Sequence, residues 1–164
     1  MLDGNRAGAG PQRPVHAGGV SSDPFDLHRF LDAQHGTHEG ATRELRAGRK
    51  TGHWMWWTFP QLAGLGRSAT SVRYAVSGLA EARAYLTHPA LGARLRECAQ
   101  ILLDLPGRDA EEVLGDVDAV KLRSSMTLFA AADPDDPAFS AVLEEYFGGE
   151  RDGETTELLA REGV

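Results

Sequence analysis

All three tryptophans of the chain lie within four residues, at positions 54, 56 and 57, and basic groups stand just upstream. An indole can stack on a planar ligand ring, while a cationic side chain binds an anionic group of the same ligand. A nucleotide carries both features. The segment supplies the side chains that such a site needs, namely Arg49, Lys50, His53, Trp54, Trp56 and Gln61.

The tryptophans also have an ordinary explanation, because tryptophan is mostly a packing residue. In that case they fill the core, and Arg49 and Lys50 are solvated. However, no helix or strand can bury three neighbouring indoles on one face. The cluster must therefore serve the core and something else, or two separate cores. We expect at least one of the three to anchor the core and at least one to line a pocket. The sequence leaves open which indole does which.

A second group of polar side chains lies in a predicted helix over 118–131. Lys121 faces Ser124 and Ser125, which follow it by three and four residues. A lysine beside two hydroxyls can bind an anion or activate a serine as a nucleophile. The alternative is structural, with the serines bonded back to helix carbonyls and Lys121 paired with Asp118 or another acid. We include Lys121 and Ser125 in the predicted ligand site.

The six histidines and the single cysteine do not form a pattern typical of a metal site. His35 and His38 are three residues apart, but Gly36 interrupts the helix that would align them. No carboxylate or cysteine pattern completes a site. Cys98 falls in an apolar stripe, which predicts a buried and inert thiol. We therefore expect no metal, no cofactor and no intrachain disulfide.

Composition limits the classes of function. The formal net charge of −7 argues against a general nucleic-acid coat, which needs lysines and arginines to neutralise phosphates. No apolar run approaches the roughly 20 residues that span a bilayer. Residues 1–22 lack the apolar region of a secretory signal, and one cysteine fits a reducing compartment. These observations favour a cytoplasmic protein without a membrane partner, and they predict no oligomeric state.

The elements that must position these side chains are predicted to be helices. Residues 1–22 are rich in Gly, Ala and Pro, so we expect a disordered leader before a single compact domain over 23–164. Asp23 and Pro24 suit the start of the first helix. An apolar stripe typical of an amphipathic helix follows at Leu91, Leu95, Cys98, Leu102 and Leu105.

Other signals complete the prediction of an all-α fold. Pro60 ends the aromatic segment, and two glycines predict a loop over 61–70. Ser77 and Asp118 suit the caps of later helices, and a further helix is predicted over 137–147. Alternating β-branched runs are absent, so no sheet is expected. The class is all-α, with about seven short to medium helices.

Several motifs closely resemble an uncharacterised, mostly bacterial family filed as domain of unknown function eighteen-ten. The resemblance covers residues 25–147, and its motifs include Asp26-Leu27-His28-Arg29-Phe30, Glu44-Leu45-Arg46-Ala47-Gly48-Arg49-Lys50, His53-Trp54-Met55-Trp56 and Lys121-Leu122-Arg123-Ser124-Ser125-Met126. It implies a compact all-helical fold and no established activity. Some members carry the name calpastatin, but nothing here is similar to a disordered protease-inhibitor repeat. Because polar residues belong to these motifs, the resemblance favours a site.

The leading hypothesis is a pocket for a small anionic, planar, nucleotide-like ligand, walled by residues 49–61 and by the face of Lys121. A fainter likeness to N-glycosidases, in residues 87–95, makes hydrolysis of an N-glycosidic bond the first candidate reaction. Its general acid–base would be His53, Glu44 or Asp118. The alternative is a non-enzymatic interaction module that binds its partner through an exposed tryptophan patch.

Overall fold

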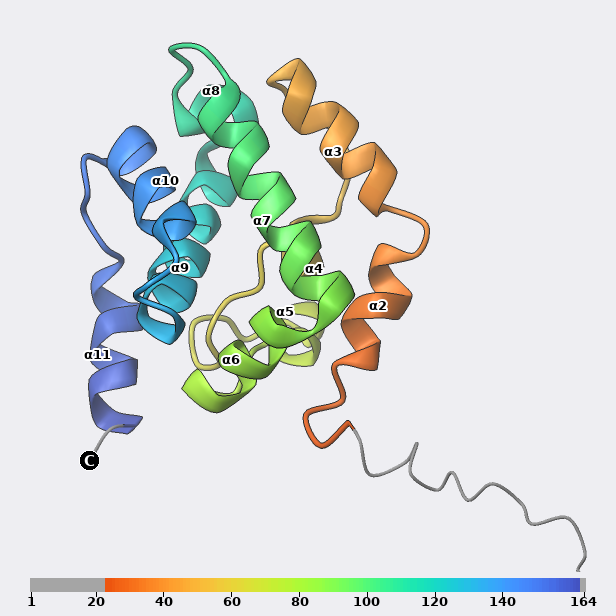
Figure 1. Cartoon of the computed structure of the whole chain (residues 1–164), viewed down its shortest axis with the longest axis vertical. Helices are drawn as coiled ribbons and strands as arrows, with labels where there is room; N and C mark the ends of the chain where they lie inside the picture. The colour runs from red at the N-terminus through yellow and green to blue at the C-terminus, as the bar shows by residue number, and fades with distance from the viewer. Residues whose placement is uncertain (1–22, 163–164) are drawn as a thin grey trace, which may run out of the picture.

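The structure is a computed structural model that describes residues 23–162, and every regular element in this range is a helix (Figure 1). The helices are α2 (His28–Gln34), α3 (His38–Ala47), α4 (Met55–Thr58), α5 (Ala69–Arg73), α6 (Leu79–Thr87), α7 (Pro89–Asp104), α8 (Ala110–Leu114), α9 (Asp116–Ala132), α10 (Pro137–Phe147) and α11 (Gly153–Glu162). The all-α prediction is confirmed for this range. Its ten helices exceed the predicted seven, because α4 and α5 form where we expected irregular chain. The predicted leader, 1–22, lies outside the described residues.

The longest helix, α9, lies at the centre of the packing and contacts α6, α8, α10 and α11 (Figure 1). Leu122, Met126 and Phe129 are fully buried, as their spacing predicts. The prediction that Asp118 caps this helix is wrong, because α9 begins two residues earlier and follows Gly115. Asp118 lies in the first turn instead, where its carboxylate binds two lysine side chains.

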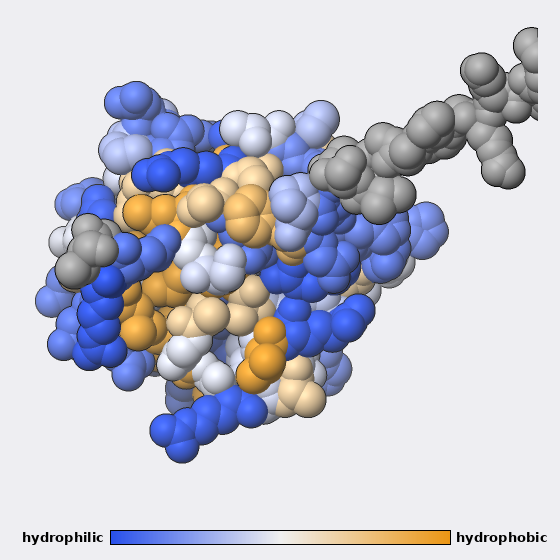
Figure 2. Space-filling model, turned by 90° about the horizontal axis from the view of Figure 1, so that it is seen from below, coloured by the Kyte–Doolittle hydropathy of each residue, from blue (hydrophilic) through white to orange (hydrophobic). Residues whose placement is uncertain are grey.

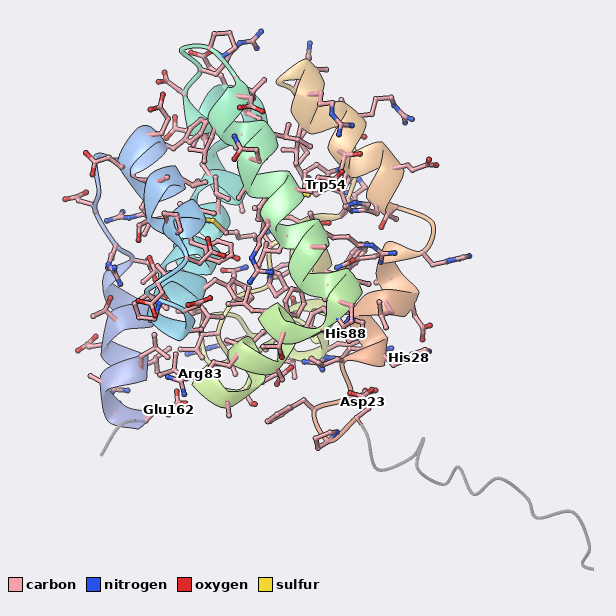
Figure 3. All side chains as sticks on the ribbon, in the orientation of Figure 1. Asp23, His28, Trp54, Arg83, His88 and Glu162 are labelled. Atoms are coloured by element: carbon pink, nitrogen blue, oxygen red, sulfur yellow. The ribbon has the colours of Figure 1, made fainter. Side chains whose placement is uncertain are left out.

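Helix α7 packs against α3, α6 and α10. Its predicted apolar stripe is confirmed by four side chains that are at most 1% exposed: Leu91, Leu95, Cys98 and Leu102. His88, labelled in Figure 3, caps the start of this helix, and its Nδ1 accepts hydrogen bonds from the backbone N–H groups of Ala90 and Leu91. A histidine therefore fills the role that Ser, Thr, Asp or Asn usually plays at a helix start.

The prediction that the first helix starts at Pro24 is wrong. Helix α2 begins at His28, after a turn in which Asp26 has a φ of 53°. A right-handed helix cannot run through that conformation. Asp23 nevertheless satisfies donors at the start of α2, since its carboxylate accepts the N–H groups of Leu27 at 2.7 Å and His28 at 3.1 Å.

A closed loop, residues 61–76, joins the aromatic segment to α6. Two backbone hydrogen bonds of 2.8 Å hold its ends together: Ala63 donates to the Val76 carbonyl, and Val76 donates to the Gln61 carbonyl. Helix α5 lies inside this loop, capped by the Ser68 hydroxyl, which accepts the N–H of Ser71. The predicted loop over 61–70 is therefore shorter than expected, because its last two residues already belong to α5.

The surface seen from below shows apolar side chains gathered in its middle, with hydrophilic side chains around them (Figure 2). Across residues 23–162, the strongly exposed large aliphatic side chains are Val72, Val117 and Val120. Among the helices that the structure describes, none has the length and apolar character needed to cross a membrane.

Candidate functional site

The three neighbouring indoles have different surroundings. Trp54 is 2% exposed and belongs to the core, and its Nε1–H donates to the Glu44 carboxylate at 3.0 Å. Trp57 is half-buried, and its Nε1–H donates to Thr37 Oγ1 at 2.9 Å. Trp56 is also half-buried but lines a cavity. The turn of α4 separates them, because successive helical residues point about 100° apart.

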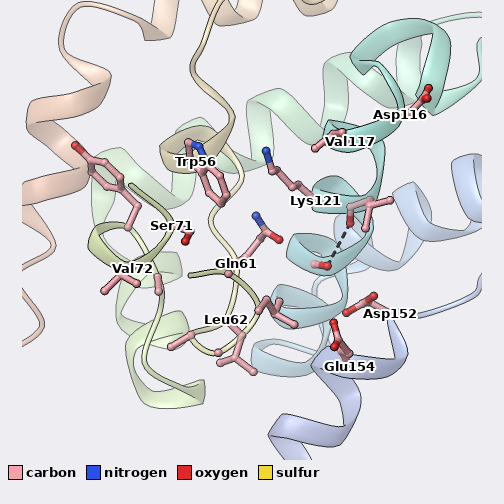
Figure 4. A pocket seen from close by; sticks show the side chains of 18 residues that line it. Trp56, Gln61, Leu62, Ser71, Val72, Asp116, Val117, Lys121, Asp152 and Glu154 are labelled. Carbon is pink, nitrogen blue, oxygen red and sulfur yellow. Dashed lines mark hydrogen bonds between the residues drawn. The ribbon is translucent and has the colours of Figure 1, made fainter. Parts of the chain in front are cut away.

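The cavity has a volume of about 560 Å³ and lies between the loop 61–76, α9 and the start of α11 (Figure 4). A volume of this size suits a small-molecule ligand. Its apolar lining consists of Trp56, Leu62, Ala63, Leu65, Val72, Tyr74, Ala75, Val117 and Val120. Its polar side chains are Gln61, Ser71, Asp116, Lys121, Ser124, Asp152 and Glu154.

Two lysines share one aspartate between the core and the cavity. Asp118 Oδ2 lies 2.7 Å from Lys50 Nζ, and Asp118 Oδ1 lies 3.0 Å from Lys121 Nζ. Each ammonium also faces an indole: Lys50 is 5.1 Å from the ring centroid of Trp54, and Lys121 is 4.1 Å from that of Trp56. Burial disfavours the charged form of Asp118, but hydrogen bonds from both lysines outweigh this and hold its pKa below its usual value.

Lys121 is the member of this cluster that faces the cavity. Its side chain is 18% exposed, and within residues 23–162 Asp118 is the acid that lies at ion-pair distance from it. An ammonium has three donors. One binds Asp118 and the indole of Trp56 covers another direction, which leaves donor capacity for an acceptor in the cavity. Lys50 is more enclosed, since its Nζ also donates to the Gly52 carbonyl at 2.6 Å.

Glu44 holds the other side of the aromatic segment in place. Its Oε1 accepts the backbone N–H groups of Thr51 and Gly52 and the indole N–H of Trp54, at 2.7 to 3.0 Å. Burial raises the pKa of this carboxyl, but these hydrogen bonds outweigh burial and lower the pKa to about 2. Glu44 is therefore ionised at neutral pH and fixes the backbone that precedes the tryptophans.

The structure does not bring all of the predicted site residues together. Trp56, Gln61 and Lys121 line the cavity, whereas Lys50 lies outside the lining and pairs with Asp118. Arg49 and His53 are exposed and outside its lining, and Trp54 is in the core.

The two predicted serines of α9 also separate. Ser124 lines the cavity and donates to the Val120 carbonyl at 3.2 Å, the structural alternative that its position in the helix allowed. Ser125 is fully buried, and within the described residues its hydroxyl has no hydrogen-bond partner. Lys121 likewise pairs with Asp118, so neither serine has a lysine as an activating base.

Several lining residues escaped the sequence analysis. Val117 and Val120 are three residues apart, so they form a small apolar patch on the polar side of α9. This patch could have been recognised from the sequence, but the more pronounced apolar stripe through Leu122 predicts a single buried face of the helix. Asp152 and Glu154 gave no signal, because only the packing of α11 on α9 brings them to the cavity.

Between residues 23 and 162, no group of three or more His, Cys, Asp or Glu side chains is placed to hold a metal ion. The acidic side chains at the cavity are Asp116, Asp152 and Glu154, and Asp152 uses one carboxylate oxygen to accept the N–H and the hydroxyl of Thr155.

Comparison with known proteins identifies the family. Residues 24–159 match the family described as Protein of unknown function (DUF1810). The chain belongs to this family. The match covers the motifs of the aromatic segment and of α9, so the DUF1810 resemblance seen in the sequence is confirmed.

A solved structure shares this architecture. The crystal structure of the conserved hypothetical protein Rv1873 from Mycobacterium tuberculosis is 53% identical in sequence to this chain, with a TM-score of 0.83. The alignment covers 84% of this chain and 99% of that one. A comparison with curated proteins gave no match. The family and its fold are thus known, and neither comparison names an activity.

Proposed function

We propose that the chain binds a small planar ligand with one anionic group in the cavity between the loop 61–76 and α9. The observation that supports this most directly is the position of Lys121, whose ammonium lies 4.1 Å from the centroid of Trp56 at the cavity wall. The anionic group of the ligand would accept a hydrogen bond from Lys121. Gln61 lines the same cavity and offers a neutral donor beside it.

The apolar lining supports a planar body for this ligand. Trp56 and Tyr74 both line the cavity, and aromatic rings bind planar groups by offset stacking or edge contacts. Leu62 and Leu65 add aliphatic surface to the same lining. Ligand sites of this kind bury most of their ligand against apolar walls and orient it with a few polar groups.

The candidate acid–base residues for N-glycosidic hydrolysis are poorly placed for that reaction. His53 is exposed and outside the lining of the cavity. Glu44 has a pKa of about 2 and therefore holds no proton to donate at neutral pH. Asp118 binds two lysines. We accordingly propose ligand binding and assign no reaction.

A protein-interaction module has less support in this structure. That function needs a patch of exposed indoles, whereas Trp54 is 2% exposed and the other two tryptophans are half-buried. Trp54 and Trp57 also use their indole N–H groups inside the molecule.

The proposal is tested by titrating the full chain with planar anions such as benzoate, nicotinate and AMP, with thermal unfolding and tryptophan fluorescence as readouts. We expect at least one of them to raise the unfolding temperature and change the fluorescence. Trp56→Phe should abolish the fluorescence response, whereas Trp57→Phe is the matched control that should keep it. Lys121→Gln should weaken binding by about tenfold or more, the usual loss for a hydrogen bond to a charged group.

Two results would count against the proposal. The first is that none of these anions changes either signal at millimolar concentration. The second is a response that survives in Trp56→Phe and disappears in Trp57→Phe, which would place the ligand on the other half-buried indole.

A further inference from the structure

Three exposed valines surround the mouth of the cavity. Val72, Val117 and Val120 are 63%, 68% and 60% exposed, and all three line this one cavity. Val72 comes from α5 and the other two come from α9. Figure 4 shows Val72 and Val117 on opposite sides of the cavity. A scattered exposed valine needs no explanation, but a group around one cavity marks a surface that a ligand can cover.

The cationic group lies further inside than the valines. The Lys121 side chain is 18% exposed, whereas each valine is at least 60% exposed. A ligand whose anionic group reaches Lys121 would therefore place the rest of its body between the valines. Burial of apolar ligand surface there is favourable in proportion to the area removed from water.

The remaining charges limit how many negative charges the ligand can carry. The lining contains one lysine and three carboxylates, Asp116, Asp152 and Glu154. Figure 4 shows Asp152 and Glu154 together on the side of the cavity below Lys121. A second or third phosphate would approach these carboxylates, and like charges repel at short range. Lys121 is itself partly compensated by Asp118, at 3.0 Å.

From these three observations we infer that the ligand is a hydrophobic monoanion: a planar aromatic carboxylate that carries an alkyl chain. Its carboxylate accepts a hydrogen bond from Lys121, its ring lies beside Trp56, and its chain covers the valines. This inference rests on the proposed ligand site and narrows the ligand class. It disfavours the polyphosphates among nucleotide-like ligands.

The test is a series of calorimetric titrations of the full chain with benzoate, para-propylbenzoate and para-pentylbenzoate. Each methylene that the valines cover should raise the affinity by up to about fourfold. Neutral para-pentylbenzamide, which keeps the chain and loses the charge, should bind about tenfold more weakly or worse. Along the series AMP, ADP and ATP, affinity should fall with each added phosphate.

Valine variants test the wall directly. Val72→Thr and Val120→Thr keep the side-chain shape and make the rim polar, so they should reduce both the gain per methylene and the affinity for para-pentylbenzoate. Both positions are exposed, so the fold should tolerate the changes. Ala93→Ser, at an exposed position of α7 outside the cavity, is the control that should alter neither quantity.

The possible results separate this inference from the proposed function. If benzoate binds but affinity is independent of chain length, or if ATP binds more tightly than AMP, the hydrophobic-monoanion inference is wrong and the ligand site stands. Equal binding of the benzamide and the benzoate would also overturn it, because the chain alone would then drive association. If no member of either series binds, both proposals fail.

Discussion

At the scale of single residues, one carboxylate organises the candidate site. Asp118 binds Lys50 on its core side and Lys121 on its cavity side, and each lysine faces a different tryptophan. The helix spacing of Asp118 and Lys121 made that pair foreseeable. The contact with Lys50 spans 68 residues of sequence between positions 50 and 118, and no local pattern indicates it.

Glu44 gives a prediction for the dependence of stability on pH. Its folded-state pKa of about 2 is lower than its ordinary value of 4.5, so ionised Glu44 stabilises the folded state. That stabilisation is fully present above pH 4.5 and is lost as pH falls toward 2. Glu44→Gln should therefore lower the free energy of unfolding by about 1 kcal/mol near neutral pH, after allowance for solvent screening.

The measurement is urea unfolding of both proteins across this pH range. The difference between them should shrink as pH falls below 4.5. Glu39→Gln, an exposed position on the same helix, is the control and should show little difference at any pH. If the difference in unfolding free energy between the wild type and Glu44→Gln stayed constant down to pH 2, the charge of Glu44 would not be the source of the stabilisation.

At the scale of elements, the site depends on how the loop 61–76 and α11 meet α9. The loop is closed by hydrogen bonds of 2.8 Å at Ala63 and Val76, and α5 within it carries Val72 to the cavity. The proline and glycines of this segment predict only that the chain is irregular there, because they reflect local backbone preferences. The backbone pairing that closes it joins residues far apart in sequence, so the sequence does not indicate it.

The junction of α6 and α7 gives a prediction at this scale. A Cβ atom at Gly92 would collide with the backbone carbonyl of Leu86, which cannot move aside without shifting α6. Gly92→Ala should therefore destabilise the protein by about 2 kcal/mol, the usual range for overpacking a tight contact.

Gly40 provides the matched comparison on α3. Its Cβ would meet only the flexible guanidinium of Arg43, at 3.6 Å. Because alanine is a better helix former than glycine, Gly40→Ala should stabilise the protein by about 0.5–1 kcal/mol. Urea denaturation of the two variants checks both signs. If both variants changed the free energy of unfolding by a similar amount, the backbone near Leu86 would be able to accommodate a Cβ atom at Gly92 without loss of stability.

At the scale of the whole molecule, the core is continuous from α2 to α10 and encloses the single cysteine. Cys98 is 1% exposed, and burial raises the pKa of its thiol to about 12. Both properties suppress the thiolate, which is the reactive form. This agrees with the inert thiol that its place in the apolar stripe predicts.

Thiol labelling of Cys98 should therefore report global unfolding. An aromatic disulfide reagent near pH 8 should label the native chain only as fast as it opens, and added urea should accelerate labelling in step with unfolding. Complete labelling in strong denaturant is the control for reagent activity. Rapid labelling of the native chain would mean that α7 opens locally, without unfolding of the rest.

The amino-acid sequence by itself determined the helical class, most helix positions and the buried faces of α7 and α9. These properties follow from local spacing, because apolar residues at helical intervals must face one side. Helix starts were less predictable. Aspartate is a residue type that commonly caps helices, and the sequence predicts this role for both Asp23 and Asp118. Asp23 instead accepts backbone N–H groups from the far side of a turn, and Asp118 binds lysine side chains.

Only the tertiary structure decided which polar residues line the cavity. Arg49, His53 and Lys121 are equally plausible by residue type, but only Lys121 faces the cavity. The three tryptophans differ in the same way, since the turn of α4 directs Trp54 into the core and Trp56 to the cavity wall. The physical reason is that a cavity is bounded by elements distant in sequence, so its chemistry depends on packing rather than on local pattern.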